Sequence, residues 1–134
     1  MTPSTIEFHL DAGSGLSPYL QIVRQVRHAL RLGLLREGDQ LPTVKEVVAG
    51  LAINPNTVQK AYRELEHQDL VAARPGVGTF VTRSLGSTSL AAHSALRSEL
   101  HDWLARSRQA GLDDESIEAL FVAAVRAQAR GDVA

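Results

Sequence analysis

Two helix-start signals, at Thr43 and Asn54, lie so close together that the chain between them has room for only one short helix and a tight turn. Thr43 and Glu46 have the spacing of a capping box, in which each side chain bonds the free backbone N–H of the other residue. Asn54 precedes Pro55, and proline suits a first-turn position because no N–H is needed there. These signals predict one helix that starts after Thr43 and stops within residues 50–52, and a second helix that starts at Pro55.

The second of these helices, predicted to run from residue 55 to about residue 69, has two chemically different faces. Its apolar residues share one face: Val58, Ala61, Tyr62 and Leu65. Its polar residues point elsewhere: Asn56, Gln59, Lys60 and Arg63. The spacing therefore predicts a helix that is buried along one side and open to a partner or to water along the other.

The flanking segments complete a small domain. An apolar stripe predicts a helix that starts at Pro18, after Ser17, and ends within residues 33–35. Two β-prone stretches, 70–73 and 79–82, are separated by the glycine-containing residues 74–78 and predict a hairpin. An alternation over residues 6–10 predicts one edge strand. Helices followed by a hairpin in this order are typical of a winged helix-turn-helix.

The chain after residue 83 is of a different kind. Residues 83–89 are small and polar and predict a hinge, and two further helices follow it, one ending at Gly111 and one capped by Asp113. Each carries an apolar stripe that a lone helix pair cannot fully bury, so a second copy of the chain is the natural cover. The predicted dimer-interface residues are Leu96, Leu100, Trp103, Leu104, Ile117, Leu120, Phe121, Ala124 and Val125.

The predicted fold class is therefore mainly α with a small β wing. Residues 1–83, with a motif core at 18–82, form the winged helix-turn-helix domain, and residues 84–134 form a two-helix dimerisation segment. A chain of 134 residues, 44% of them hydrophobic, can bury one main core of this kind.

Composition excludes several classes of protein. There is no cysteine, which excludes disulfides, thiolate zinc sites and a cysteine nucleophile. No apolar run approaches the length of about eighteen residues that a membrane span needs, and the N-terminus does not resemble a signal peptide, so we expect a cytoplasmic protein that does not bind membranes. The histidines are scattered, and no nucleophile stands beside a base. We expect no metal, no cofactor and no enzymatic activity.

Net charge does not point to nucleic acid by itself. The formal charge is -1, with nine Lys and Arg against eight Asp and Glu over residues 1–83. Any affinity for DNA must therefore come from a local group of polar and basic side chains, because phosphate contacts depend on nearby charge more than on the total.

Four separated motifs resemble the GntR family of bacterial transcription regulators. They are P-Y-L-Q-I at Pro18–Ile22, G-D-Q-L-P-T at Gly38–Thr43, N-P-N-T-V-Q-K-A-Y-R-E-L-E at Asn54–Glu66 and G-V-G-T-F-V at Gly76–Val81. The short two-helix remainder resembles the YtrA-type subfamily. This resemblance implies that helix 55–69 lies in the major groove of DNA and that the wing, residues 74–78, reaches the adjacent minor groove.

The chemistry of the exposed side chains fits that expectation. An amide such as that of Gln59 can present a donor and an acceptor together to adenine, whereas lysine and arginine can bond phosphate. Lys45 stands where the family usually has arginine in an L-P-S-x-R pattern, so we expect a phosphate contact there and no bidentate guanine contact. The predicted DNA-binding residues are Thr43, Lys45, Asn54, Asn56, Thr57, Gln59, Lys60, Arg63, Arg74 and Gly76.

The expected function is that of a homodimeric repressor whose partner is a double-stranded, pseudo-palindromic operator. A small-molecule effector, if one is bound, must use the dimer interface or the groove between domains, because few residues follow the wing. The alternative is a winged-helix module that binds another protein and not DNA. The near-neutral charge suits this alternative, and the salt dependence of binding separates the two.

Overall fold

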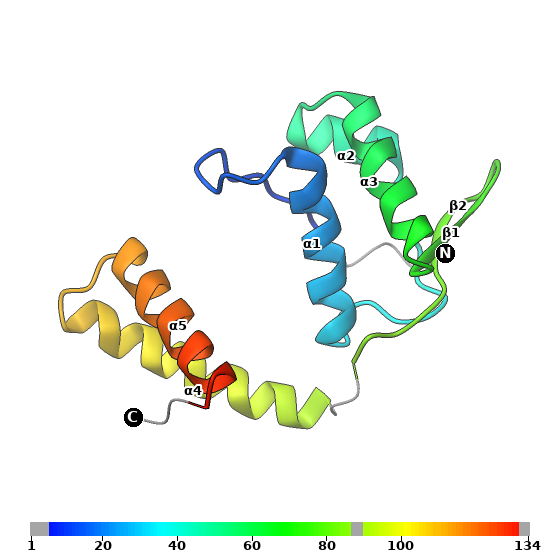
Figure 1. The fold of residues 1–134 in the computed structure, drawn as a ribbon. Coiled ribbons are helices and arrows are strands. Elements are labelled where there is room, and N and C mark those ends of the chain that lie inside the picture. Colours follow the sequence, from blue (N-terminus) through cyan, green and yellow to red (C-terminus); the bar gives the residue numbers. More distant parts are fainter. Residues whose placement is uncertain (1–5, 87–89, 132–134) are drawn as a thin grey trace. The chain divides into compact units, whose positions relative to one another are not determined.

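A computed structural model describes residues 6–86 and 90–131 of the chain (Figure 1). The chain divides into two compact units, Met1–Leu90 and Ala91–Ala134. Leu85 packs against the core of the first unit, so this unit extends past the wing. Of the predicted hinge at residues 83–89, residues 87–89 lie outside the described part of the chain.

The first unit contains three helices, α1 (Pro18–Arg31), α2 (Val44–Leu51) and α3 (Pro55–His67). Both predicted caps are present. The Thr43 hydroxyl accepts the N–H of Glu46 at 3.1 Å, and the Glu46 carboxylate accepts the backbone N–H of Thr43. The Asn54 side chain accepts the N–H of Asn56 at 2.8 Å. The helix-turn-helix expectation is confirmed, with α3 ending at His67.

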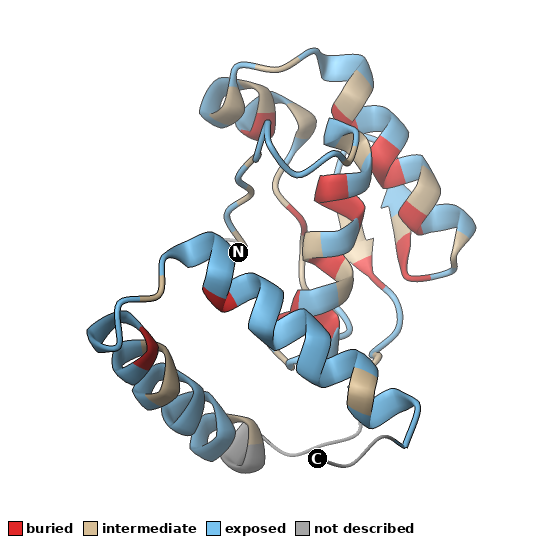
Figure 2. Cartoon of the chain, turned by 60° about the vertical axis from the view of Figure 1, so that its left-hand side comes forward, coloured by how far each residue is buried: buried red, intermediate tan, exposed pale blue. Residues whose placement is uncertain are grey.

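The core of this unit lies between α1, α3 and the base of the wing, where Figure 2 shows buried positions on both helices. Its largest fully buried side chains are Ile22, Val26, Leu30, Leu35, Leu41, Val58, Leu65 and Leu70. At roughly 1.5–3 kcal/mol for each fully buried aliphatic side chain, this cluster is the main favourable term in the stability of the unit. The exposed face of α3 is therefore held on a rigid support.

The wing is an antiparallel hairpin of β1 (Val71–Arg74) and β2 (Gly78–Val81), in which Val71 pairs with Val81 and Arg74 with Gly78. The connector between α1 and α2 runs along the other edge of β2. Its residues 38–41 exchange backbone hydrogen bonds of 2.8–2.9 Å with Thr79 and Val81. The outer edge of the hairpin is thus paired at its base and tied to the segment that leads into α2.

The expectation of an edge strand at residues 6–10 is wrong, because these residues are in no strand. Ile6 and Phe8 do pack against the core, as the alternation requires. The backbone nearby pairs with glutamine side chains of α1 and not with a strand. Gln25 accepts the N–H of His9 at 3.1 Å and donates to its carbonyl at 2.7 Å, and the side chain of Gln21 bonds Asp11 in the same way.

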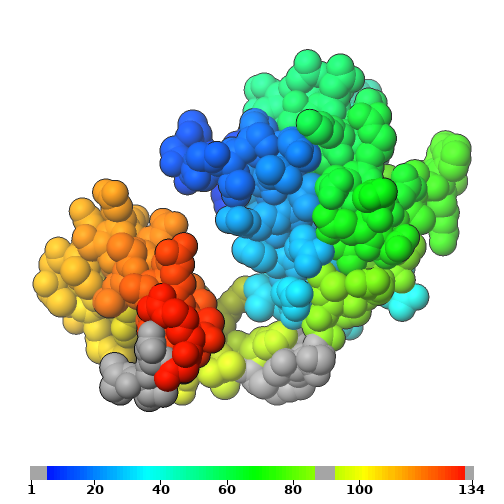
Figure 3. Space-filling view, in the orientation of Figure 1, coloured from blue at the N-terminus to red at the C-terminus, as the bar shows by residue number. Residues whose placement is uncertain are grey.

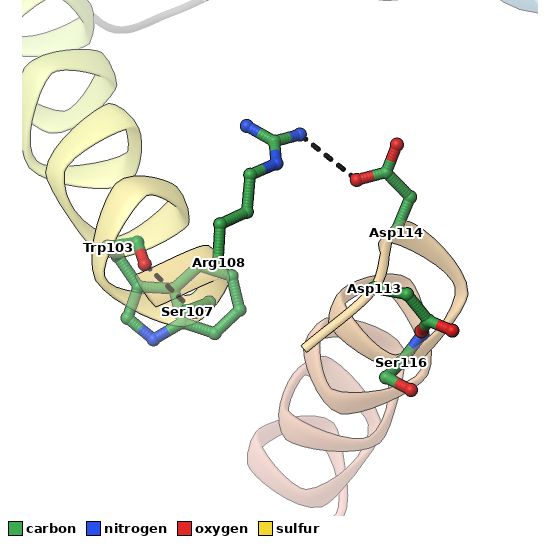
Figure 4. Close-up of polar contacts among 6 residues, drawn as sticks. All are labelled: Trp103, Ser107, Arg108, Asp113, Asp114 and Ser116. Atoms are coloured by element: carbon green, nitrogen blue, oxygen red, sulfur yellow. Dashed lines mark hydrogen bonds and ion pairs between the residues drawn. The ribbon is translucent and has the colours of Figure 1, made fainter. Parts of the chain in front are cut away.

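The second unit is a hairpin of α4 (Leu90–Gln109) and α5 (Asp114–Ala129). Asp113 caps α5 as predicted, because its carboxylate accepts the N–H of Ser116 at 2.8 Å. Hydrogen bonds from the Ser116 side chain and backbone hold the pKa of this carboxyl below its usual range. Figure 4 shows Arg108 near the end of α4 paired with Asp114 at 3.1 Å. Both partners are largely exposed, so this pair adds little stability.

No helix in the described ranges, residues 6–86 and 90–131, has the length and apolar character that crossing a membrane requires.

Tyr62 links α3 to the start of α2. Its hydroxyl donates to the carbonyl of Pro42 at 2.6 Å, and only 7% of the residue is exposed. Burial, assisted by the negative charge of Glu46, raises the pKa of Tyr62 well above its ordinary value of 10.0. The protonated hydroxyl is therefore part of the folded structure.

The raised pKa of Tyr62 predicts that the protein loses stability in alkali. The unfolded chain releases this proton from about pH 10 upward while the folded chain keeps it. The free energy of unfolding is therefore undiminished below that pH and falls above it, by up to about 1.4 kcal/mol per pH unit. Urea titrations at pH 8 to 11 should show this slope for the wild type and for Tyr19→Phe, and a smaller slope for Tyr62→Phe. Equal slopes in all three proteins would contradict the assignment.

Candidate nucleic-acid interface

The predicted polar face of α3 is open to solvent. Asn56, Gln59, Lys60 and Arg63 are all exposed, whereas the apolar residues of the helix are buried, with Val58, Ala61 and Leu65 at 0% exposure. Because one side of α3 is buried in the core, the helix cannot rotate, and its four exposed polar side chains keep fixed positions on the surface of the domain. A helix that recognises the edges of base pairs in the major groove of DNA needs this arrangement.

Asn54 satisfies the backbone at the start of α3. Its side-chain oxygen accepts the N–H of Asn56, and its carbonyl accepts the N–H of Thr57 at 3.0 Å. These two backbone donors are thus already used within the helix start. Any phosphate contact at this end of α3 must come from side chains, mainly those of Asn56 and Thr57.

Lys60 is more constrained than its sequence position indicates. Its ammonium group lies 4.1 Å from the centre of the Tyr19 ring at the start of α1. A cation over an aromatic face is attracted to the ring by about 0.5–1 kcal/mol at an exposed site. The charge of Lys60 is therefore held toward the N-terminus of α1. Tyr19 falls on the apolar stripe of the helix that starts at Pro18, and helical spacing gives no signal for its contact with Lys60.

The two predicted residues near the start of α2, Thr43 and Lys45, differ in whether their side chains are available to an outside partner. The Thr43 hydroxyl both accepts from the Glu46 backbone and donates to the Glu46 carboxylate, at 3.0 Å, so the donor that a phosphate would need is taken up by the cap. Lys45, two residues later, is exposed. The lysine is therefore the better candidate for a partner outside the chain.

The wing stands out from the rest of its unit in the space-filling view of Figure 3. Arg74 stacks its guanidinium on the ring of Phe80, 4.6 Å from its centre, which supports the arginine from the adjacent strand. Gly76 has a φ of +77°, which glycine adopts without strain, and a Cβ there would meet no other atom. The absence of a side chain leaves the backbone of the wing tip open to close approach.

Two side-chain contacts join the wing to its surroundings, one from α3 and one from the connector before α2, and sequence reasoning missed both. The Glu66 carboxylate near the end of α3 accepts the N–H of Ala73 at 3.1 Å. Gln40, in the connector before α2, donates to the carbonyl of Val77 at the wing tip, at 3.3 Å. Hydrophobic spacing gives no signal for such contacts, because each is a polar bond and apolar spacing reports only which side chains face a core. The structure thereby fixes α3 and the wing in one frame.

The predicted dimer residues lie in the second unit, and most are exposed in the single chain. Leu96, Leu100, Leu120, Phe121 and Val125 are between 41% and 61% exposed. Trp103 and Leu104 are half-buried, and Ile117 is buried in the chain itself. Figure 2 shows most of α4 and α5 in the colour of exposed residues. Two helices with this much uncovered apolar surface have an unpartnered face.

Comparison with known proteins places this arrangement in a family. Residues 18–81 match the family model described as "Bacterial regulatory proteins, gntR family". The chain is 32% identical over 99 residues to the HTH-type transcriptional regulator YhcF of Bacillus subtilis, covering 74% of this chain and 82% of that protein. The chain belongs to the GntR family. The family resemblance of the four motifs is thereby confirmed, and with it the winged helix-turn-helix predicted from the order of the helices and the hairpin.

Two further proteins resemble it over most of the chain. The HTH-type transcriptional repressor YtrA of Bacillus subtilis is 29% identical over 109 residues, which are 81% of this chain and 84% of the repressor. The solved structure of YtrA from Sulfolobus acidocaldarius, described as a GntR-family transcription factor, superposes with a TM-score of 0.53 at 26% identity. It covers 73% of this chain and 97% of the other. The YtrA-like subfamily predicted from the short two-helix remainder is thus supported.

Lys45 gives a direct test of whether α2 takes part in the interface. If it contacts a phosphate, Lys45→Ala should make the log–log dependence of affinity on salt shallower by about 0.9, measured by fluorescence anisotropy on a duplex of mixed sequence. Arg24→Ala removes one exposed charge from α1 and is the matched control, for which we expect an unchanged slope. The same change in both variants would point to general charge and against a contact by Lys45.

Proposed function

We propose that this GntR protein is a homodimeric, sequence-specific repressor that binds a pseudo-palindromic operator. In this proposal α3 enters the major groove and the wing at residues 74–78 enters the adjacent minor groove. The observation that carries it is the exposed polar face of α3 on a helix whose other face is buried in the core. Since its target is bacterial DNA, the protein acts in the cytoplasm, and its activity requires no cofactor and no catalytic step.

Within α3 the residues take two kinds of role. Gln59 reads a base, because its side-chain amide is exposed on the polar face and can donate and accept at once. Asn56 and Thr57 contact the sugar-phosphate backbone and set the register of the helix on the duplex. Lys60 and Arg63 add phosphate contacts on the flanks. Lys60 does so beside the N-terminus of α1, where the Tyr19 ring holds it.

Two of the predicted residues contribute indirectly. Asn54 and Thr43 each cap a helix with the side-chain oxygen that could otherwise accept a bond from outside. Their effect on DNA binding is to set where α3 and α2 begin. Lys45 contributes a phosphate contact, since an ammonium group lacks the planar fork that bonds guanine twice.

The wing supplies the contacts to the minor groove. Its tip is narrow, and Gly76 carries no side chain that would keep the backbone away from the duplex. Arg74 provides the positive charge beside the tip, where it pairs with Gly78. Arginine suits this place because a narrow minor groove concentrates negative potential.

The exposed apolar faces of α4 and α5 support a dimer. A twofold dimer buries the same patch from both chains, which suits α4 and α5, because the apolar side chains predicted there are largely exposed in the single chain. Two winged domains related by a twofold axis bind two inverted half-sites. The pseudo-palindromic operator follows from this symmetry.

The second candidate function is a winged-helix module that binds another protein. The net charge of -1 favours it, since a DNA-binding domain usually carries a clear positive excess. A protein interface of this kind lacks the steep loss of affinity with salt that phosphate contacts produce.

Gln59 tests base reading. On the operator selected from random duplexes, Gln59→Ala should weaken binding by roughly 1–3 kcal/mol. On duplex of mixed sequence the loss should be much smaller. Gln109→Ala removes an exposed glutamine at the end of α4 and should change neither affinity. Competition titrations measure both affinities, and equal losses on the two duplexes would remove Gln59 from base recognition.

Phe121 tests the dimer. It is 47% exposed on α5, so replacing it disturbs the single chain less than replacing the half-buried Trp103. Phe121→Asp would place a charge in the apolar interface, and sedimentation velocity should then find monomers where the wild type forms dimers. Ala119→Asp puts the same charge on the opposite side of α5 and should leave the dimer intact. A dimer that persists in Phe121→Asp would place the interface elsewhere.

A further inference from the structure

The tip of the wing has little to hold it within the hairpin. Two glycines with positive φ, Gly76 at +77° and Gly78 at +148°, flank Val77, a residue that is 62% exposed. Inside the hairpin, the N–H of Val77 bonds the carbonyl of Arg74 at 2.9 Å. Glycines lose more conformational freedom on ordering than other residues, so a tip of this composition gains most from an outside contact.

Gln40 supplies a contact from outside the hairpin. Its side-chain amide donates to the carbonyl of Val77 at 3.3 Å and lies directly over Gly78, where a Cβ would collide with it. Its backbone forms a bridge to Phe80 in β2. The Phe80 ring in turn carries the guanidinium of Arg74. One residue of the connector thus touches the tip of the wing and the strand that supports its charge.

Gln40 lies next to residues that the core of the domain holds in place. It immediately precedes Leu41 and Pro42, which lead into α2, and Leu41 is fully buried. The neighbouring backbone is bonded to β2, with the N–H of Leu41 donating to Thr79 at 2.9 Å. The position of Gln40 is therefore fixed by the same core that fixes α2 and α3.

We propose that Gln40 is a positioning residue for DNA recognition, whose amide holds the wing tip at a set angle to α3 so that both reach the duplex together. Preorganising a flexible element removes the cost of ordering it on binding. Glycine at position 78 is needed for the same reason, because it leaves space for the amide. This inference rests on the proposed function, since it assigns Gln40 to the wing that enters the minor groove.

The first test needs no DNA. In backbone ¹⁵N relaxation of the intact protein, Gln40→Ala should lower the order parameters of the Val77 and Gly78 amides from about 0.85 toward 0.6, while those of α3 stay constant. The melting temperature should stay unchanged, because no buried apolar group is lost. Gln109→Ala serves as the control. Unchanged order at the wing tip would overturn the inference whatever the protein does with DNA.

The second test uses the operator duplex selected from random sequences. Gln40→Ala should lower affinity about threefold to tenfold, with hydroxyl-radical protection lost in the minor groove and base protection in the major groove retained. In the Arg74→Ala background the same change should cost less than about twofold, because both residues act through the wing. A uniform loss of protection, or full additivity with Arg74→Ala, would overturn the positioning role.

The two tests separate the inference from the function on which it rests. A wild-type chain that binds no duplex, in a protein whose wing tip loses order in Gln40→Ala, would overturn the proposed function but not the contact. A wild-type chain that protects both grooves, with no change in Gln40→Ala, would overturn the inference and leave the function standing.

Discussion

The turn between α2 and α3 is the constraint on which the rest of the structure depends. Ala52 ends α2 in a left-handed conformation with a φ of 54°, which costs a residue with a Cβ roughly 1–2 kcal/mol. Asn54 then starts α3 by accepting its first free N–H group. The reversal is sharp because one helix stops and the next begins within a few residues. Packing of Val47 and Val58 in the common core offsets the strain.

That turn gives α3 its two roles. One face joins α1 and the base of the wing in a close-packed core, and the opposite face carries exposed polar side chains. A recognition helix needs both properties, because side chains can select a base only if the helix beneath them does not shift. The polar contacts from Glu66 and Gln40 extend the same rigidity to the wing. The recognition helix α3 and the wing then form one rigid unit.

Local signals predicted much of this arrangement. Helix caps at Thr43, Asn54 and Asp113 act over three residues or fewer, so spacing alone reveals them, and the helical stripes follow from a period that tertiary contacts did not override. The edge strand at residues 6–10 failed for a physical reason. Alternation reports which side chains face a core, but a strand also needs a partner backbone, and here glutamine side chains of α1 take that place.

Contacts between distant segments were beyond prediction. Nothing near Lys60 in sequence reveals that it lies over Tyr19, and nothing near Gln40 reveals that it meets Val77. The cap at Asn54 was predicted. Only the hydrogen bonds in the structure show that it occupies the backbone N–H groups of both Asn56 and Thr57. Sequence therefore identified the exposed residues of the site, and the structure separated those free to contact a partner from those that hold the frame.

The central claim is that two winged domains of one dimer read two inverted half-sites. Selection of bound duplexes from a random pool by the intact protein, followed by sequencing, tests it most directly. The account predicts enrichment of an inverted repeat, with half-sites at one fixed spacing of about one helical turn or a multiple of it. A pool that stays random after repeated selection, or one that converges on a single half-site without a symmetric mate, would contradict it.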